Sequence, residues 1–245
     1  MIISDKFRLN GNTLKLIAAL SMLLDHIGYM LFPRVTLLRI LGRLAFPIFA
    51  FMVAQGCRYT RNKLRHFLSI FILGVVMQVV MHIAGEGGVS NIFLTFSLSI
   101  LLIYILDGVK KLIFVKKSRF YIIFLAFAGF LVTFAVFYYL AQKLRVDYGI
   151  FGCMMPLMAS LFFSEDGYPE FFRRLDVLPM HIFTMSLCLL AHALIKGGVQ
   201  LYAVLALPLL LLYSGKRGKM NLKWFFYIFY PAHMVIIYAI DMFLK

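Results

Sequence analysis

Charged residues, and acidic residues above all, are scarce in this sequence. Only 14% of the 245 residues are charged, with 10 Asp or Glu against 25 Lys or Arg, and 63% are hydrophobic. Soluble domains contain about 25% charged and about 45–50% apolar residues. This composition would leave lipid-like surface in water, so it excludes an ordinary soluble domain and predicts an integral membrane protein.

Cysteine is also rare, and its spacing excludes two further classes. Cys57, Cys153 and Cys188 are odd in number and far apart, so we expect neither a disulfide framework nor a CxxC metal site. No Pro/Ser-rich linker or low-complexity block divides the chain. We therefore expect residues 1–245 to form a single integral membrane domain without a bound metal.

Long apolar runs extend along the whole chain. The first run contains Asp25 and His26 and lacks a small-residue cleavage site, so we do not interpret it as a signal peptide. Because a span needs roughly 17–25 apolar residues, the sequence predicts an all-α, polytopic bundle. Its helices, about nine in number by this length criterion, are predicted near 14–32, 37–56, 67–84, 92–106, 119–141, 149–164, 179–195, 199–213 and 224–243.

Lysine and arginine are distributed unevenly between successive loops, and the cytoplasmic side of a membrane protein retains them. One set of loops contains Lys6, Arg8, Lys15, Arg58, Arg61, Lys63, Arg65, Lys110, Lys111, Lys116, Lys117, Arg119, Arg173, Arg174, Lys216, Arg217, Lys219 and Lys223. The other set contains Arg34, Arg39, Lys143, Arg145, Lys196 and Lys245. This alternation predicts a cytoplasmic amino terminus, a carboxyl terminus on the opposite side, and contact with anionic membrane lipids. No nucleic-acid partner is expected, because the charges do not form one contiguous basic face.

A few ionisable residues lie inside the predicted spans, where a charge costs about 2.5–3.5 kcal/mol on insertion scales. Asp25 and His26 follow Leu14 by roughly 16–18 Å of helix rise, and Arg43 lies at a similar distance from the outer end of the second span. We therefore expect an ion pair between Asp25 and Arg43. His26 is either a structural donor to a backbone carbonyl or a general base. Adjacent helical residues point about 100° apart, so a group that orients His26 is expected from another helix.

The last predicted span contains a second polar centre. His233 lies roughly 14 Å from the inner end at Trp224, a depth comparable with that of His26. Pro231 frees the carbonyl of Tyr227, one turn earlier, as an acceptor. Two histidines at one depth predict a common cavity. A satisfied core histidine and a catalytic one both remain open for His233.

Several stretches of the chain closely resemble the TraX family. They are Leu14–Gly28 (LKLIAALSMLLDHIG), Arg39–Phe51 (RILGRLAFPIFAF), Asn91–Thr95 (NIFLT), Asp147–Gly149 (DYG) and Phe226–His233 (FYIFYPAH). TraX proteins are membrane proteins linked to amino-terminal acetylation of conjugative pilin. They are also similar, more distantly, to the acyltransferase-3 membrane acyltransferases.

The resemblance implies an acetyltransferase of the bacterial cytoplasmic membrane that uses acetyl-CoA. A first-span histidine of the larger family corresponds to His26, and an Arg-x-x-Arg element associated with acyl-CoA corresponds to Arg58 and Arg61, although a basic loop also follows from topology alone. Together with Lys63 and Arg65, the Arg58 and Arg61 side chains would form a cationic binding site for the CoA phosphates. The acceptor would be an extracytoplasmic amine or hydroxyl, on a pilin amino terminus or an envelope glycan.

In this mechanism His26 removes a proton from the acceptor, and Arg43 or His233 stabilises the oxyanion. Asp25 pairs with Arg43, and a covalent acetyl-histidine is an alternative route. The candidate acceptor-binding residues toward the outer side are Arg39, Asn91, Thr95, Asp147 and Tyr148. Capping or loop bonding is the alternative role for Asn91 and Thr95.

Two other classes of function remain open. A transporter would use Asp25, His26, Arg43 and His233 to bind a solute or relay protons at the midplane. A non-catalytic pilus or envelope assembly factor would need none of this chemistry. Acetyl-CoA binding that depends on Arg58 and Arg61 would favour the enzyme.

Overall fold

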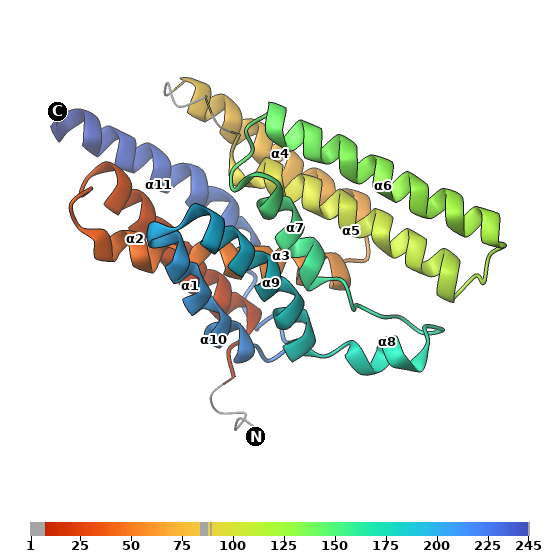
Figure 1. Ribbon diagram of the computed structural model, residues 1–245. Helices are drawn as coiled ribbons and strands as arrows, with labels where there is room; N and C mark the ends of the chain where they lie inside the picture. Colours follow the sequence, from red (N-terminus) through yellow and green to blue (C-terminus); the bar gives the residue numbers. More distant parts are fainter. Residues whose placement is uncertain (1–7, 84–87, 89, 245) are drawn as a thin grey trace. The chain divides into compact units, whose positions relative to one another are not determined.

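The computed structural model describes residues 8–83, 88 and 90–244, and these residues form helices joined by loops (Figure 1). In chain order the helices are α1 (Gly11–Met30), α2 (Thr36–Gly42), α3 (Ala45–Tyr59), α4 (Lys63–Ile83), α5 (Ile92–Phe114), α6 (Phe120–Lys143), α7 (Gly149–Ala159), α8 (Glu170–Leu175), α9 (Leu178–Lys196), the 3-10 helix η2 (Gly198–Leu205), α10 (Ala206–Leu211) and α11 (Lys223–Leu244). The all-α class is therefore confirmed. Lys6 and Lys245, two of the basic residues used to predict orientation, lie outside the described residues.

Within the described part of the chain, 7 helical segments are long and apolar enough to cross a membrane. They are Gly11–Met30, Thr36–Tyr59, Lys63–Ile83, Ile92–Phe114, Phe120–Lys143, Leu178–Lys196 and Trp224–Leu244. The other two predicted spans correspond to the shorter apolar helices Gly149–Ala159 and Gly198–Leu211. A helix as short as α7 rises about 16 Å, roughly half of the hydrocarbon core. The chain is thus polytopic, while a total of about nine crossings and the cytoplasmic amino terminus stay predictions.

The chain forms two compact units. The terminal unit consists of Met1–Met52 and Ser186–Lys245, and the middle unit consists of Val53–Met185. The division falls inside α3 and α9, so each of these helices contributes to both units. The site residues predicted from the first and last spans all belong to the terminal unit.

In the terminal unit, α1 and α11 start at the same end. The backbone amide of Leu9 donates to the carbonyl of Leu212 (2.8 Å), and the amide of Ser214 donates to the carbonyl of Leu9 (2.8 Å). Asn12 Nδ2 also donates to the carbonyl of Met220 at 2.6 Å. Because these contacts join the segments that precede the two helices, and because the helices pack together, α1 and α11 run in the same direction (Figure 1).

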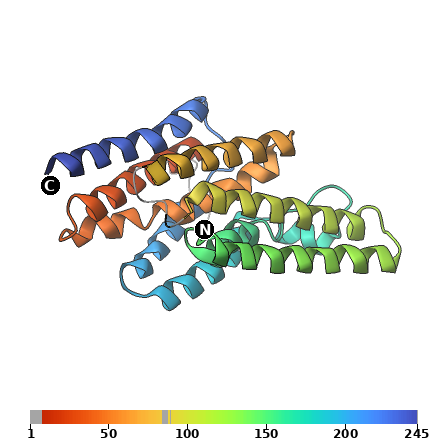
Figure 2. The ribbon, with the colours of Figure 1, turned by 90° about the horizontal axis from the view of Figure 1, so that it is seen from above.

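In the middle unit, α5 packs against α4, α6 and α7. Ile100, Leu102 and Ile103 are fully buried in α5, and α6 lies beside α5 in both views (Figure 1, Figure 2). No residue in the apolar span of α6 is fully buried, although α6 packs against α5, so much of its apolar surface is available to lipid. The middle unit is therefore built around α5.

Candidate functional site

Four elements of the terminal unit bring ionisable and amide side chains together. Asp25 and His26 come from α1, the two arginines from α2 and its carboxyl end, the glutamine from η2 and the second histidine from α11. Gln200 and His233 are buried, and the other four residues are partly exposed. We call this set the polar cluster, and its members are Asp25, His26, Arg39, Arg43, Gln200 and His233.

Asp25 is the centre of the charged half of the cluster. Arg43 Nη2 donates to both carboxylate oxygens of Asp25, which confirms the predicted ion pair. Arg39 Nη1 donates to Asp25 Oδ2 at 3.0 Å and to the carbonyl of Asp25 at 3.2 Å. The Arg39 guanidinium also lies 4.9 Å from the centre of the Tyr29 ring. One carboxylate thus faces two guanidinium groups, so these three side chains carry one excess positive charge.

Gly42 explains how the short α2 can lie so close to α1. A Cβ atom at this position would lie 2.7 Å from Asp25 Cα, well inside normal contact distance. Any larger residue would separate the two helix backbones. The glycine between Arg39 and Arg43 therefore allows both arginines to reach the same carboxylate.

The two histidines form a directed hydrogen-bonded chain. His26 Nδ1 lies 2.9 Å from His233 Nε2, and His233 Nδ1 lies 2.7 Å from the carbonyl oxygen of Phe229. The sequence predicted a carbonyl partner at Tyr227, whereas the acceptor found here is Phe229, one turn before His233 on the same helix. The predicted orienting group for His26 is thus His233, from another helix.

The Phe229 carbonyl fixes the protonation pattern of this chain. A carbonyl can only accept, so His233 Nδ1 carries the hydrogen and, in the neutral ring, His233 Nε2 is an acceptor. His26 Nδ1 must then donate to it, which leaves the lone pair of neutral His26 on Nε2. His233 is 5% exposed. The arrangement therefore presents His26 Nε2 as the basic atom and shields its partner from water.

Gln200 completes the cluster and was not predicted. Its Oε1 accepts a hydrogen bond from Arg43 Nη1 at 3.1 Å, and the residue is 7% exposed. A single amide in the otherwise apolar predicted span 199–213 is the signal that could have identified it. Its neighbours in η2, together with Thr36 and Ile40 of α2, line an open groove of about 640 Å³.

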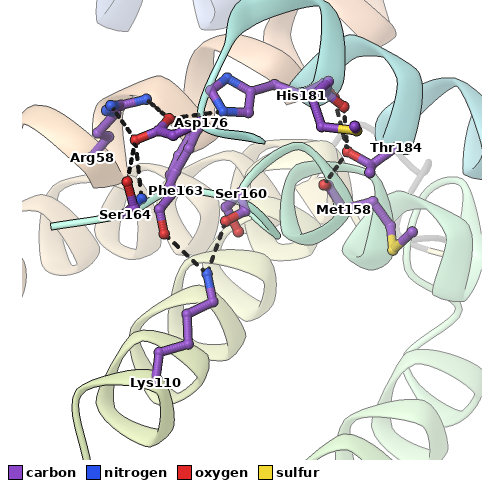
Figure 3. A network of polar contacts seen from close by, with 10 residues as sticks. Arg58, Lys110, Met158, Ser160, Phe163, Ser164, Asp176, His181 and Thr184 are labelled. Atoms are coloured by element: carbon purple, nitrogen blue, oxygen red, sulfur yellow. Dashed lines mark hydrogen bonds and ion pairs between the residues drawn. The ribbon is translucent and has the colours of Figure 1, made fainter. Parts of the chain in front are cut away.

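Arg58, a predicted CoA-binding residue, lies in the middle unit and is engaged by Asp176 (Figure 3). Arg58 Nη1 and Nη2 donate to the two Asp176 carboxylate oxygens at 2.7 and 2.8 Å. Asp176 also accepts from Ser164 Oγ at 2.9 Å, and His181 Nε2 lies 3.0 Å from it. Burial alone would raise the pKa of Asp176, but hydrogen bonds from His181 and Arg58 hold that pKa well below its usual range.

The other three predicted CoA-binding residues lie beside the start of α4. Arg61 and Arg65 are exposed, and the backbone amide of Arg65 donates to the Asn62 side chain at 2.8 Å. Lys63 Nζ lies 3.5 Å from Asp107 Oδ2. A role for these residues in CoA binding stays a prediction.

The remaining acceptor-binding candidates also belong to the middle unit, apart from Arg39. Asn91 caps α5 by accepting from the Phe93 amide (3.1 Å) and donates to the Gly74 carbonyl (2.7 Å). Thr95 Oγ1 donates to the Asp147 carbonyl at 3.2 Å. In addition, the Asp147 carboxylate accepts from the Tyr148 amide at 3.0 Å. The structure thus brings these four residues together through capping and loop contacts, and their role toward an acceptor stays a prediction.

The three cysteines, Cys57, Cys153 and Cys188, are free and buried. Among the described residues, no group of three or more His, Cys, Asp or Glu side chains is arranged to hold a metal ion.

Comparison with known proteins finds a matching family model and curated relatives. A family model described as TraX protein matches residues 10–241. The probable fimbrial assembly protein FimC, serogroup H1, of Dichelobacter nodosus is 25% identical over 257 residues, which cover 95% of this chain and 96% of that protein. The uncharacterized protein RP591 of Rickettsia prowazekii is 38% identical over 79 residues, which cover 32% of this chain and 30% of that protein. No solved structure matches the chain.

Proposed function

The chain belongs to the TraX family, and from that premise we propose that it is a membrane acetyltransferase. It moves an acetyl group from cytoplasmic acetyl-CoA to an amine or hydroxyl of an extracytoplasmic acceptor. The observation that carries this proposal is the directed chain from the Phe229 carbonyl through His233 to His26. That chain leaves a basic imidazole nitrogen inside the polar cluster.

The proposed reaction uses His26 as general base and then as general acid. His26 Nε2 removes a proton from the acceptor amine or hydroxyl as that group attacks the acetyl carbonyl carbon. The carbon–sulfur bond then breaks, and the proton passes to the departing CoA thiolate. His233 holds the ring of His26 in one tautomer and shares the transient positive charge through the 2.9 Å contact. General acid–base catalysis of this kind contributes about 10²–10⁴-fold to the rate.

The charged half of the cluster supports the developing oxyanion. Asp25 neutralises one of the two guanidinium groups that contact it, so the remaining positive charge is available to an anion. Electrostatic stabilisation is strongest where donors are already fixed and water is excluded. We assign this role to Arg43, which Asp25 and Gln200 hold from two sides.

The CoA phosphates would bind cationic side chains on the cytoplasmic side. Asp176 already accepts two hydrogen bonds from Arg58, so the exposed Arg61 and Arg65, with Lys63, are the better candidates. This assignment is part of the proposal, and it takes from the sequence two expectations: a distant relation to acyltransferase-3 proteins and a cytoplasmic amino terminus in the bacterial cytoplasmic membrane.

For the acceptor, we propose the amino terminus of a pilin or fimbrial subunit. The support is the Dichelobacter relative, which is named a probable fimbrial assembly protein and aligns over nearly its whole length with this chain. An envelope glycan hydroxyl offers the same chemistry and is the alternative acceptor.

The test is transfer across a membrane by purified protein in liposomes. Labelled acetyl-CoA is supplied on one side and a peptide with a free amino terminus on the other. The proposal predicts that one acetyl group appears on the peptide for each CoA thiol released. If neither product forms while the liposomes contain folded protein, the acetyltransferase proposal is wrong.

A proton-coupled transporter is the second candidate, because the same two-histidine chain could pass a proton between α1 and α11. Solute-driven proton flux in those liposomes, without CoA release, would favour it. Pilus assembly that survives loss of both histidines would favour a non-catalytic assembly factor.

A further inference from the structure

In the side-chain amide of Gln200, the oxygen is hydrogen-bonded and the nitrogen has no partner among the described residues. Its Oε1 faces Arg43 Nη1 at 3.1 Å. Arginine can only donate, so the amide oxygen must point toward Arg43, and this settles the orientation of the whole amide group. The Nε2 atom, with two hydrogens, therefore points elsewhere.

Gln200 Nε2 is a buried donor without a hydrogen-bond partner among the described residues. The residue is 7% exposed, so bulk water does not replace the missing acceptor. Folded chains rarely bury such a group, because its desolvation is not compensated. An unpartnered buried donor beside an arginine that is held by other side chains is typical of a site that a ligand atom completes.

The backbone conformation before Gln200 places its side chain on the inner face of η2. Gly197 and Gly198 have φ of +64° and +55°, which ends α9 and starts η2. A 3-10 helix repeats every three residues, so Gln200 and Ala203 share one face of η2, and both are buried. The flanking side chains of Val199 and Leu201 line the groove between α2 and η2. The polar end of Gln200 therefore lies on the inner face while its neighbours form the groove wall.

We propose that Gln200 is a catalytic residue whose Nε2 donates to the carbonyl oxygen of the acetyl group, next to Arg43. This inference rests on the proposed acetyltransferase function and names a second donor for the same oxyanion. As the acceptor attacks, negative charge moves onto the carbonyl oxygen, and Gln200 strengthens its hydrogen bond without forming or breaking a covalent bond. When the intermediate collapses, an oxygen lone pair re-forms the carbonyl double bond, the carbon–sulfur bonding pair leaves with sulfur, and the CoA thiolate takes the proton held by His26.

Two substitutions separate this role from simple support of Arg43. Gln200→Glu keeps an oxygen for Arg43 and removes the Nε2 donors, whereas Gln200→Met keeps the volume and removes both contacts. If Gln200 only positions Arg43, Gln200→Glu stays active and Gln200→Met does not. If Nε2 contacts the substrate, both variants lose activity. Loss of one oxyanion donor lowers kcat by about 10²–10³-fold.

The experiment measures kcat and KM for acetyl-CoA in wild type, Gln200→Glu, Gln200→Met and the control Gln142→Glu, whose side chain is exposed at the end of α6. Infrared spectra of bound acetyl-CoA labelled at the acetyl carbonyl supply a second readout, because a lost donor raises the stretching frequency. We expect kcat to fall by about 100-fold in both Gln200 variants, an unchanged KM and a raised frequency. Wild-type activity and frequency in Gln200→Glu would overturn the inference. A wild-type protein that transfers no acetyl group would instead contradict the proposed function.

Discussion

His26 Nδ1 on α1 lies 2.9 Å from His233 Nε2 on α11, although the two residues are 207 positions apart. The Phe229 carbonyl makes this contact directional, because it requires the hydrogen of His233 to be on Nδ1. The basic nitrogen of the pair is consequently His26 Nε2.

The two histidines should act as one unit in kinetics. We expect His233→Ala to lower kcat less than His26→Ala does, because His233 orients and His26 transfers the proton. The double variant should be no slower than His26→Ala alone, since residues of one catalytic unit are not additive. Acetyl-transfer rates of the four proteins test this. If the rate loss of the double variant equals the product of the two single losses, the histidines work independently.

Removal of the Asp25 charge should destabilise the terminal unit. Asp25→Asn leaves Arg39 and Arg43 facing each other, and breaking a buried ion pair from one side costs about 3–5 kcal/mol. Thermal unfolding in detergent should show a lower midpoint than for wild type. The exposed Asp166→Asn provides the matched control.

A second substitution tests whether the excess positive charge causes the loss of stability in Asp25→Asn. In the double variant Asp25→Asn with Arg39→Gln, one positive charge is removed together with the carboxylate. We expect part of the lost thermal stability to return. A further fall in the midpoint would show that Arg39 contributes through something other than its pairing with Asp25.

The close approach of α1 and α2 should tolerate no side chain at residue 42. In Gly42→Ala the new Cβ meets the backbone and side chain of Asp25, so the helices must move apart and Arg43 loses its geometry. We expect lower thermal stability and an acetyl-transfer rate reduced at least about tenfold, since small misplacements of catalytic groups are costly. Gly129→Ala is the control, because its Cβ would meet nothing within 4 Å.

The middle unit should lose stability in acid through Asp176. Its folded-state pKa is lowered despite burial, by hydrogen bonds from His181 and Arg58. The stability that the Asp176 carboxylate contributes is therefore complete above the pKa of an unfolded aspartate, about 3.9. It is lost as the pH falls through the lower pKa of the folded state. Unfolding midpoints measured against pH should fall less steeply in acid for Asp176→Asn than for wild type. Identical slopes would contradict the assigned contacts.

Substitutions at the exposed Arg61 and Arg65 should change the KM for acetyl-CoA, whereas substitution of Arg58 should change thermal stability. Arg61→Gln and Arg65→Gln should each raise KM for acetyl-CoA up to about fivefold, because an exposed ion pair is worth up to about 1 kcal/mol. Added salt should shrink this difference. Arg58→Gln should instead lower thermal stability, because Asp176 loses its bidentate partner. A large, salt-sensitive change in KM that occurs only in Arg58→Gln would indicate that Arg58 binds CoA.

Much of the fold could be predicted because a bilayer imposes simple length rules. Each predicted span coincides with a helical segment, and only the regions of α7 and of η2 with α10 are too short to span as helices. Depth along the helices was enough to predict the Asp25–Arg43 pair and the meeting of His26 with His233. Both are consequences of the 1.5 Å rise per residue and of the cost of an unpaired charge in lipid.

The rest of the site depends on tertiary contacts that spacing does not reveal. Arg39 lies next to the predicted cluster in sequence, yet its sharing of Asp25 depends on the close approach at Gly42. Gln200 reaches Arg43 only because two glycines with positive φ start a 3-10 helix. The pairing of Arg58 with Asp176 joins residues 118 positions apart, and nothing in a basic loop distinguishes an ion pair from a phosphate ligand.

The central claim is that His26 is the general base of an acetyl transfer, and its most direct test is the rate of His26→Ala. The variant is compared with wild type and with His82→Ala, an exposed histidine at the end of α4, after thermal unfolding has shown that all three are folded. The account predicts a loss of at least about 100-fold in His26→Ala and none in His82→Ala. An undiminished rate of acetyl transfer in folded His26→Ala would contradict it.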